Sequence, residues 1–209
     1  MAVSYPISIS GLKNPRSVVI RQRSVVGVGA STFTLQPQVY AWSGQVWEAE
    51  IALAPMERAD AEAWIAKLVS LNGREGNFLI GPDYANLTPR GIGTGTPLVN
   101  GASQTGYDLI TDGWTAGQTG IMKAGDWFQL GSGSSARLYK VVVDANSSGG
   151  GAATLTIWPK LRSSPADNAA LTVSSPVGRF MLAGNETEWS IDVASFYGLS
   201  FRAVEDLRP

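Results

Sequence analysis

Residues 45–82, QVWEAEIALAPMERADAEAWIAKLVSLNGREGNFLIGP, decide the fold class of this chain. Apolar side chains recur at every second position in the first part of the stretch, so one row faces a core and the other row faces water. The apolar row consists of Trp47, Ala49, Ile51 and Leu53. The alternation predicts a half-buried antiparallel strand over residues 47–53, and residues 77–80 are expected to resume a strand.

Between these two strands the spacing of apolar residues changes to three and four, which is typical of an amphipathic helix. The apolar positions are Ala61, Trp64, Ile65, Leu68 and Leu71. Acidic residues occupy the first turns, and Asn72 and Gly73 follow where a left-handed cap is expected. We therefore predict one helix over about residues 58–71. We interpret Trp64 as packing over a sheet rather than lining a cofactor or partner groove.

Composition limits the classes of function. The chain has 209 residues, 44% of them hydrophobic, and a net charge of -1, which suits a globular protein. It contains neither cysteine nor histidine, so disulfides, thiolate chemistry and histidine-based catalytic triads or zinc sites are excluded. No apolar run reaches the ~20 residues of a membrane-spanning helix, and no secretion signal is recognised at the N-terminus. We expect no catalytic residue, metal or cofactor.

The first 47 residues are basic, with no acidic residue among them. Arg21 and Arg23 could therefore meet an acidic partner, or they could lie on the outward face of a strand and pair with acids elsewhere in the fold. The second interpretation is favoured. Residues 38–42 and 45–53 are predicted to form a hairpin whose tight turn is Ser43 and Gly44.

Residues 89–177 are predicted to form a separate all-β region, because they hold 14 of the 24 glycines and show no helical periodicity. About five short strands predict a small OB-like β-barrel, at 98–99, 107–110, 126–130, 138–143 and 153–158. Three further strands are predicted at 179–182, 188–193 and 197–204. They need a partner sheet, so residues 1–88 and 178–209 are predicted to form one discontinuous domain into which the barrel is inserted.

Three tryptophans of the barrel region are the main candidates for binding. Trp114, Trp127 and Trp158 could stack on sugar rings if they were exposed, although a tryptophan in a small barrel more often packs in the core. The aspartates of this region are interpreted as turn residues, and two of them, Asp112 and Asp126, lie beside glycines. A glycan-cleaving site would instead need two carboxylates facing one cleft about 5–9.5 Å apart.

The spacing of residues in several segments resembles that of distal tail proteins of siphophages and of tail-like gene-transfer particles. The first is W-x-x-x-I-x-L-x-P-M-x-R-x-x-A-x-x-W, from Trp47 through Trp64. The matching segments farther along are Gly113-Trp114, residues 122–127, 139–143 and 154–159, Leu161-Arg162 and the closing residues 178–182. The resemblance covers most of residues 40–205.

This resemblance implies a mainly β fold, namely a tail-tube-like β-sandwich with one helix and an inserted OB-like barrel. It implies a structural protein at the virion tail tip, assembled in the bacterial host cytoplasm. Copies would form a ring, expected to be hexameric, that joins the tail tube protein to the baseplate hub protein, with DNA only passing through the channel. Arg21 or Arg23 would contribute ring contacts. The alternative is a carbohydrate-binding or host-adhesion module of the tail tip that acts through the inserted barrel, whose three tryptophans would stack on a host surface glycan. Side fibres could be a further partner.

Overall fold

The computed structural model describes residues 3–82 and 88–208 of the chain. Within these residues the protein is mainly β, with one α-helix and two sheets, and the predicted fold class is confirmed. One sheet has seven strands and the other has six. The sequence predicted that the inserted barrel begins after residue 88. Residues 83–87, just before this boundary, lie outside the described residues.

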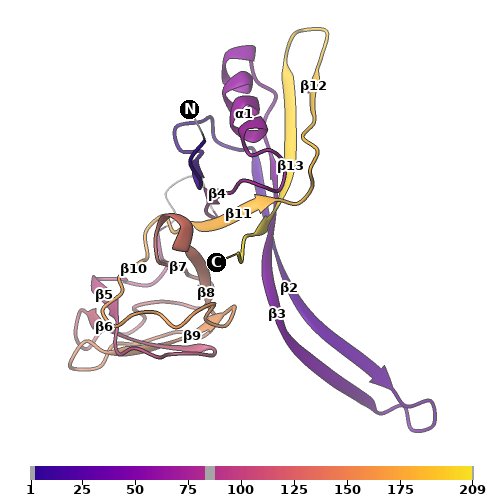
Figure 1. Ribbon diagram of the computed structural model, residues 1–209. Coiled ribbons are helices and arrows are strands. Elements are labelled where there is room, and N and C mark those ends of the chain that lie inside the picture. Colours follow the sequence, from indigo (N-terminus) through magenta and orange to yellow (C-terminus); the bar gives the residue numbers. More distant parts are fainter. Residues whose placement is uncertain (1–2, 83–87, 209) are drawn as a thin grey trace.

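The seven-stranded sheet combines strands from both ends of the sequence (Figure 1). Its order is β1-β4-β11-β13-β3-β2, and β12 pairs with β13. The strands are β1 (Ile7–Ser8), β2 (Ser17–Ala30), β3 (Pro37–Ala52), β4 (Phe78–Ile80), β11 (Gly178–Leu182), β12 (Trp189–Ile191) and β13 (Tyr197–Glu205). The inner row of β3 that the sequence predicted is buried, which gives the sheet its apolar face.

Helix α1 (Arg58–Ser70) covers that apolar face, as its periodicity predicted. Its buried residues are Ala61, Trp64, Ile65 and Leu68. The Trp64 ring lies 6.0 Å from that of Phe201 on β13, and its Nε1 donates a hydrogen bond to the carbonyl of Lys13 at 3.0 Å. Asn72 and Gly73 take the left-handed conformation after the helix. No helix among the described residues is long and apolar enough to cross a membrane.

The six-stranded sheet closes almost completely into a barrel. Its order is β10-β7-β8-β9-β6-β5, and a bridge between Leu98 and Ala170 brings the two ends together. The strands are β5 (Gly95–Val99), β6 (Asp108–Trp114), β7 (Trp127–Leu130), β8 (Arg137–Val141), β9 (Ala153–Trp158) and β10 (Leu171–Thr172), with a short 3-10 helix η1 (Gly133–Ser135) before β8. The sequence predicted five strands, because β10 is too short to show a pattern.

The predicted turn at Ser43 and Gly44 is wrong. Strand β3 runs through both residues, and its partner is β2, from which it is separated by the turn at residues 31–36. Gly44 serves a different purpose, since a Cβ at this position would lie 2.8 Å from Cγ2 of Val25. The glycine therefore makes room for a side chain of the neighbouring strand.

Candidate functional site

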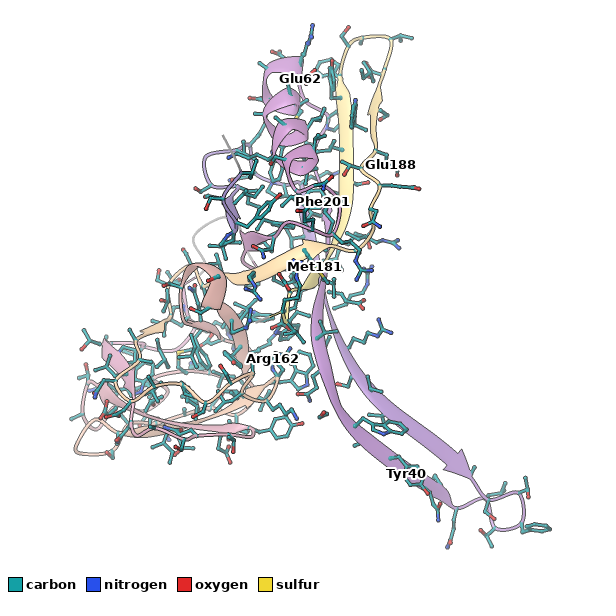
Figure 2. The ribbon with its side chains drawn as sticks, in the orientation of Figure 1. Tyr40, Glu62, Arg162, Met181, Glu188 and Phe201 are labelled. Carbon is teal, nitrogen blue, oxygen red and sulfur yellow. The ribbon has the colours of Figure 1, made fainter. Side chains whose placement is uncertain are left out.

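The distal hairpin, defined here as residues 24–46, is the most unusual surface of the molecule. Figure 1 shows it projecting beyond the other strands of its sheet and beyond the barrel, and Figure 2 shows Tyr40 on this arm, away from the rest of the fold. The turn at its end is fixed by hydrogen bonds from the amides of Phe33 and Thr34 to Oγ of Ser31, both at 3.3 Å. The arm is thus a formed two-stranded ribbon.

No residue of the distal hairpin is charged. Cross-strand partners lie on the same face of a sheet. Val28 pairs with Val39 and Val26 with Ala41, so one face of the ribbon is aliphatic. The other face is aromatic, because Tyr40 pairs with Gly27 and the Trp42 ring covers this glycine.

Both faces are open to solvent. The valines, Tyr40 and Trp42 are all about half exposed or more, and Phe33 at the tip is 97% exposed. Natural edge strands are usually protected by charges, and a lone two-stranded hairpin is at best marginally stable in water. A continuous apolar surface of this kind marks an interaction site.

The root of the hairpin holds the two arginines that were candidates for ring contacts. Arg21 Nη2 lies 2.7 Å from Glu50 Oε2, and Arg23 Nη1 lies 3.1 Å from Glu48 Oε1. Both pairs cross from β2 to β3 on the outer face of the sheet, as the favoured interpretation of the sequence expected. Their role in contacts between subunits stays a prediction.

The three candidate tryptophans do not form a binding platform. Trp114 is only 4% exposed, and its Nε1 donates to Oγ1 of Thr111 at 2.8 Å. The rings of Trp127 and Trp158 pack against Trp47, with centroids 4.6 Å and 4.2 Å away. Trp127 and Trp158 therefore pack in the contact between the barrel and the seven-stranded sheet.

A buried ion pair strengthens this junction. Glu205 at the end of β13 accepts hydrogen bonds from the guanidinium of Arg162 and from the backbone N–H of Trp47, the latter at 3.2 Å. Figure 2 shows Arg162 between the barrel and the sheet. Arg162 also donates to the carbonyl of Gln45 at 2.7 Å. The barrel is thus joined directly to the strand that continues into the distal hairpin.

Asp206 is a second buried carboxylate beside the junction. Burial alone would raise its pKa, but hydrogen bonds from Arg208, the charge of Arg179 and a hydrogen bond from Asn77 outweigh burial and lower the pKa below its ordinary value of 3.8. Arg208 contacts both carboxylate oxygens at 2.9 Å, and Asn77 donates at 2.9 Å. The folded state therefore favours the charged form of Asp206.

This arrangement predicts acid sensitivity. Because the folded-state pKa of Asp206 is lowered, its contribution to stability is complete above the ordinary aspartate pKa and is lost as pH falls from about 3.8 through the folded-state value. We expect Asp206→Asn to make the free energy of unfolding less dependent on pH below about 4. Urea unfolding of both proteins between pH 7 and pH 3 measures the difference. Parallel pH curves would contradict the prediction.

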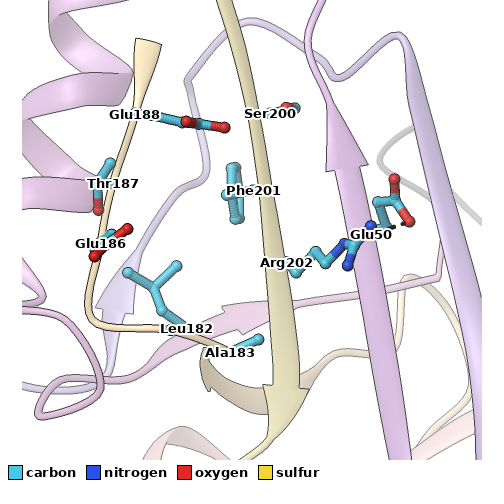
Figure 3. Close-up of a pocket in the computed structure, with 10 residues that line it drawn as sticks. Glu50, Leu182, Ala183, Glu186, Thr187, Glu188, Ser200, Phe201 and Arg202 are labelled. Atoms are coloured by element: carbon cyan, nitrogen blue, oxygen red, sulfur yellow. Dashed lines mark ion pairs between the residues drawn. The ribbon is translucent and has the colours of Figure 1, made fainter.

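A shallow groove beside β12 brings several carboxylates together. The acidic groove, about 510 Å³ in volume, is lined by Glu50, Glu186 and Glu188, and by Arg202, whose Nε lies 3.8 Å from Glu50 Oε2 (Figure 3). A general acid of glycan cleavage needs a raised pKa. The hydrogen bond and charge of Arg21 instead lower the pKa of Glu50. Among the described residues, no cluster of acidic side chains is arranged to hold a metal ion.

Comparison with known proteins adds no identity. No protein-family model matches the chain, and no curated protein matches it.

The candidate interaction surface that sequence reasoning missed is the distal hairpin. The sequence did contain a signal for this surface, because residues 24–47 include strand-like segments and no charged residue.

Proposed function

We propose that this protein is a structural subunit of a long non-contractile tail, in which copies form a ring that joins the tail tube to the baseplate hub. The observation that carries the structural part of the proposal is the uncharged distal hairpin with two exposed apolar faces. Such a surface needs a protein partner, and a further copy of the same chain is the usual one. The tail assignment rests on the resemblance of residues 47–64 and the later segments to distal tail proteins.

A ring follows from contacts that are heterologous, meaning that one surface of each copy meets a different surface of the next. If the rotation between copies closes, the ring encloses a channel through which DNA passes. The tail tube protein and the hub protein would stack on its two sides. We expect the ring to be hexameric and to reside at the virion tail tip after assembly in the host cytoplasm.

The function proposed here is geometric and requires no catalytic residue. The junction supports it, because Trp47 and Glu205 hold the barrel against the base of the hairpin arm. A subunit with fixed relative positions of barrel and arm would place its barrel reproducibly on the assembled ring. The packing of Trp127 and Trp158 in this junction gives no support to the alternative of glycan adhesion.

The hairpin makes the proposal testable with a double variant, Val28→Glu with Val39→Lys. These positions are cross-strand partners, so the new charges form an opposite pair that keeps the ribbon together while its aliphatic face is lost. Losing the burial of two valines removes about 3 kcal/mol or more from association, which weakens it at least about 100-fold. Native mass spectrometry or light scattering of the purified protein measures the effect.

The matched control is Ile110→Glu, which places one charge at an exposed apolar position of β6 in the barrel. We expect this variant to assemble like the parent, and both variants to unfold cooperatively as the parent does. A parent protein that stays monomeric and is absent from purified tails would reject the proposed function.

A further inference from the structure

A second exposed apolar surface lies on β12 and the turn that follows it. We call this the β12 surface, and it consists of Trp189, Ile191, Val193 and Phe196. Strand β12 pairs with β13 through Trp189–Leu199, Ser190–Gly198 and Ile191–Tyr197. In the described part of the chain it has no strand partner on its other edge. An edge strand with exposed large apolar residues is open to pairing with another chain.

The β12 surface and the distal hairpin lie at opposite edges of the same sheet. Strand β13 pairs with β12 on one side and with β3 on the other, and β3 in turn pairs with β2. The local order is therefore β12-β13-β3-β2, with β12 and β2 as the two edges. Figure 1 shows the β12–β13 pair and the distal hairpin extending toward opposite ends of the molecule. The two free edges of one copy therefore cannot pair with each other.

The charges around the two edges are opposite in sign. Residues 16–52, which include β2, β3 and the distal hairpin, carry Arg16, Arg21 and Arg23 against Glu48 and Glu50, which pair with Arg23 and Arg21, so this edge keeps a net charge of +1. Residues 183–196, which surround β12, carry Glu186, Glu188 and Asp192 and no basic residue. Glu186 and Glu188 also line the acidic groove beside β12 (Figure 3). An apolar centre with complementary charges around it is typical of a specific interface.

We propose that the distal hairpin of one copy docks on the β12 surface of the next copy, with the outer edge of β2 adding to β12 as a further strand. Val28 would lie beside Ile191, and the hairpin root, whose arginines pair with Glu50 and Glu48 but are half exposed or more, would lie near Glu186 and Glu188. This inference rests on the proposed function and specifies its subunit contact. Because the two surfaces differ, the contact is heterologous and repeats from copy to copy.

The competing arrangement is a two-fold pairing of hairpin with hairpin. It would leave the apolar β12 surface uncovered and its acidic surroundings, with Glu186, Glu188 and Asp192, without a basic counterpart. Docking on β12 instead covers both apolar surfaces with a single type of contact.

The absence of cysteine from the chain allows a clean crosslinking test. Val28→Cys and Ile191→Cys are introduced in two separate full-length proteins, which are mixed and oxidised. Since a disulfide forms only where Cα atoms approach to roughly 4.4–6.8 Å, we expect at least about tenfold more crosslinked dimer in the mixture than in either protein alone. Val26→Cys and Ala30→Cys, each mixed with Ile191→Cys, cover the neighbouring registers of β2. Val28→Cys mixed with Ile110→Cys is the matched control and should stay uncrosslinked.

The outcomes separate the inference from the proposed function. Oligomers that form but give no hairpin–β12 crosslink in any of the three registers would overturn the inference and leave the ring intact. Crosslinking of Val28→Cys protein with itself would establish the two-fold arrangement and also overturn it. Absence of any oligomer in the parent protein would reject the proposed function instead.

Discussion

Replacing Trp64 by alanine is expected to lower the free energy of unfolding by about 3–5 kcal/mol. Trp64 is 0% exposed and is the largest of the fully buried side chains. Its removal leaves a cavity between α1 and the sheet, because Phe201 on β13 loses its neighbouring ring. The substitution also removes the donor to the Lys13 carbonyl, which links the helix to the segment before β2. Urea unfolding followed by circular dichroism measures the change.

Two further variants separate the causes. Trp64→Phe keeps much of the apolar contact but loses the hydrogen bond, so we expect an intermediate cost of about 1–3 kcal/mol. Val69→Ala lies on the same helix but is 56% exposed, and it should change stability by no more than about 0.5 kcal/mol. If Trp64→Ala behaved like Val69→Ala, the helix would not pack on the sheet as described.

The helix could be predicted because its evidence is local. The buried positions of α1 are those that the three- and four-residue spacing selected, and Asn72 and Gly73 end it in the left-handed conformation. The second half of β3 was equally predictable, since apolar and polar residues alternate there without interruption and the apolar ones form a buried row. In both elements the burial pattern is strong over several successive residues, so a single sequence is sufficient.

The distal hairpin could not be predicted in the same way, because local signals were ambiguous. Ser43 and Gly44 have the composition of a tight turn, yet Gly44 accommodates the side chain of Val25 from the neighbouring strand. That requirement arises only once β2 and β3 are paired. The pairing itself includes a register shift between Ser24 and Val26, which no periodicity reveals.

The junction was missed because its partners are distant in sequence. Arg162 and Glu205 are separated by 43 residues, and they come from the barrel and from β13. One signal did exist, since Glu205 continues the inward phase of Leu199 and Ala203. A charged residue in a buried row needs a partner. The sequence could therefore have indicated that Glu205 is paired, but it could not have identified Arg162.

Replacing Glu205 by alanine is the second substitution with a large expected effect, a loss of about 3–5 kcal/mol in the free energy of unfolding. The side chains of Glu205 and Arg162 are 1% and 9% exposed. Without the carboxylate, the guanidinium is left buried without its counter-ion, and the backbone N–H of Trp47 loses its acceptor. Because these groups join the barrel to β3, we also expect the barrel to move more freely, which limited proteolysis measures.

The cost of Glu205→Ala arises from the charge left behind, and a double variant tests this origin. Replacing Glu205 by leucine together with Arg162 by methionine removes both charges, and exchanging a buried pair for apolar residues is often close to neutral. We therefore expect the double variant to be more stable than Glu205→Ala. The control is Glu50→Ala, at the more exposed pair with Arg21, which should lower stability far less than Glu205→Ala. Equal losses for Glu205→Ala and Glu50→Ala would show that the junction does not depend on a desolvated ion pair. A large loss restored in the double variant would instead show that shape and burial hold the barrel in place, with the charges specifying which groups meet.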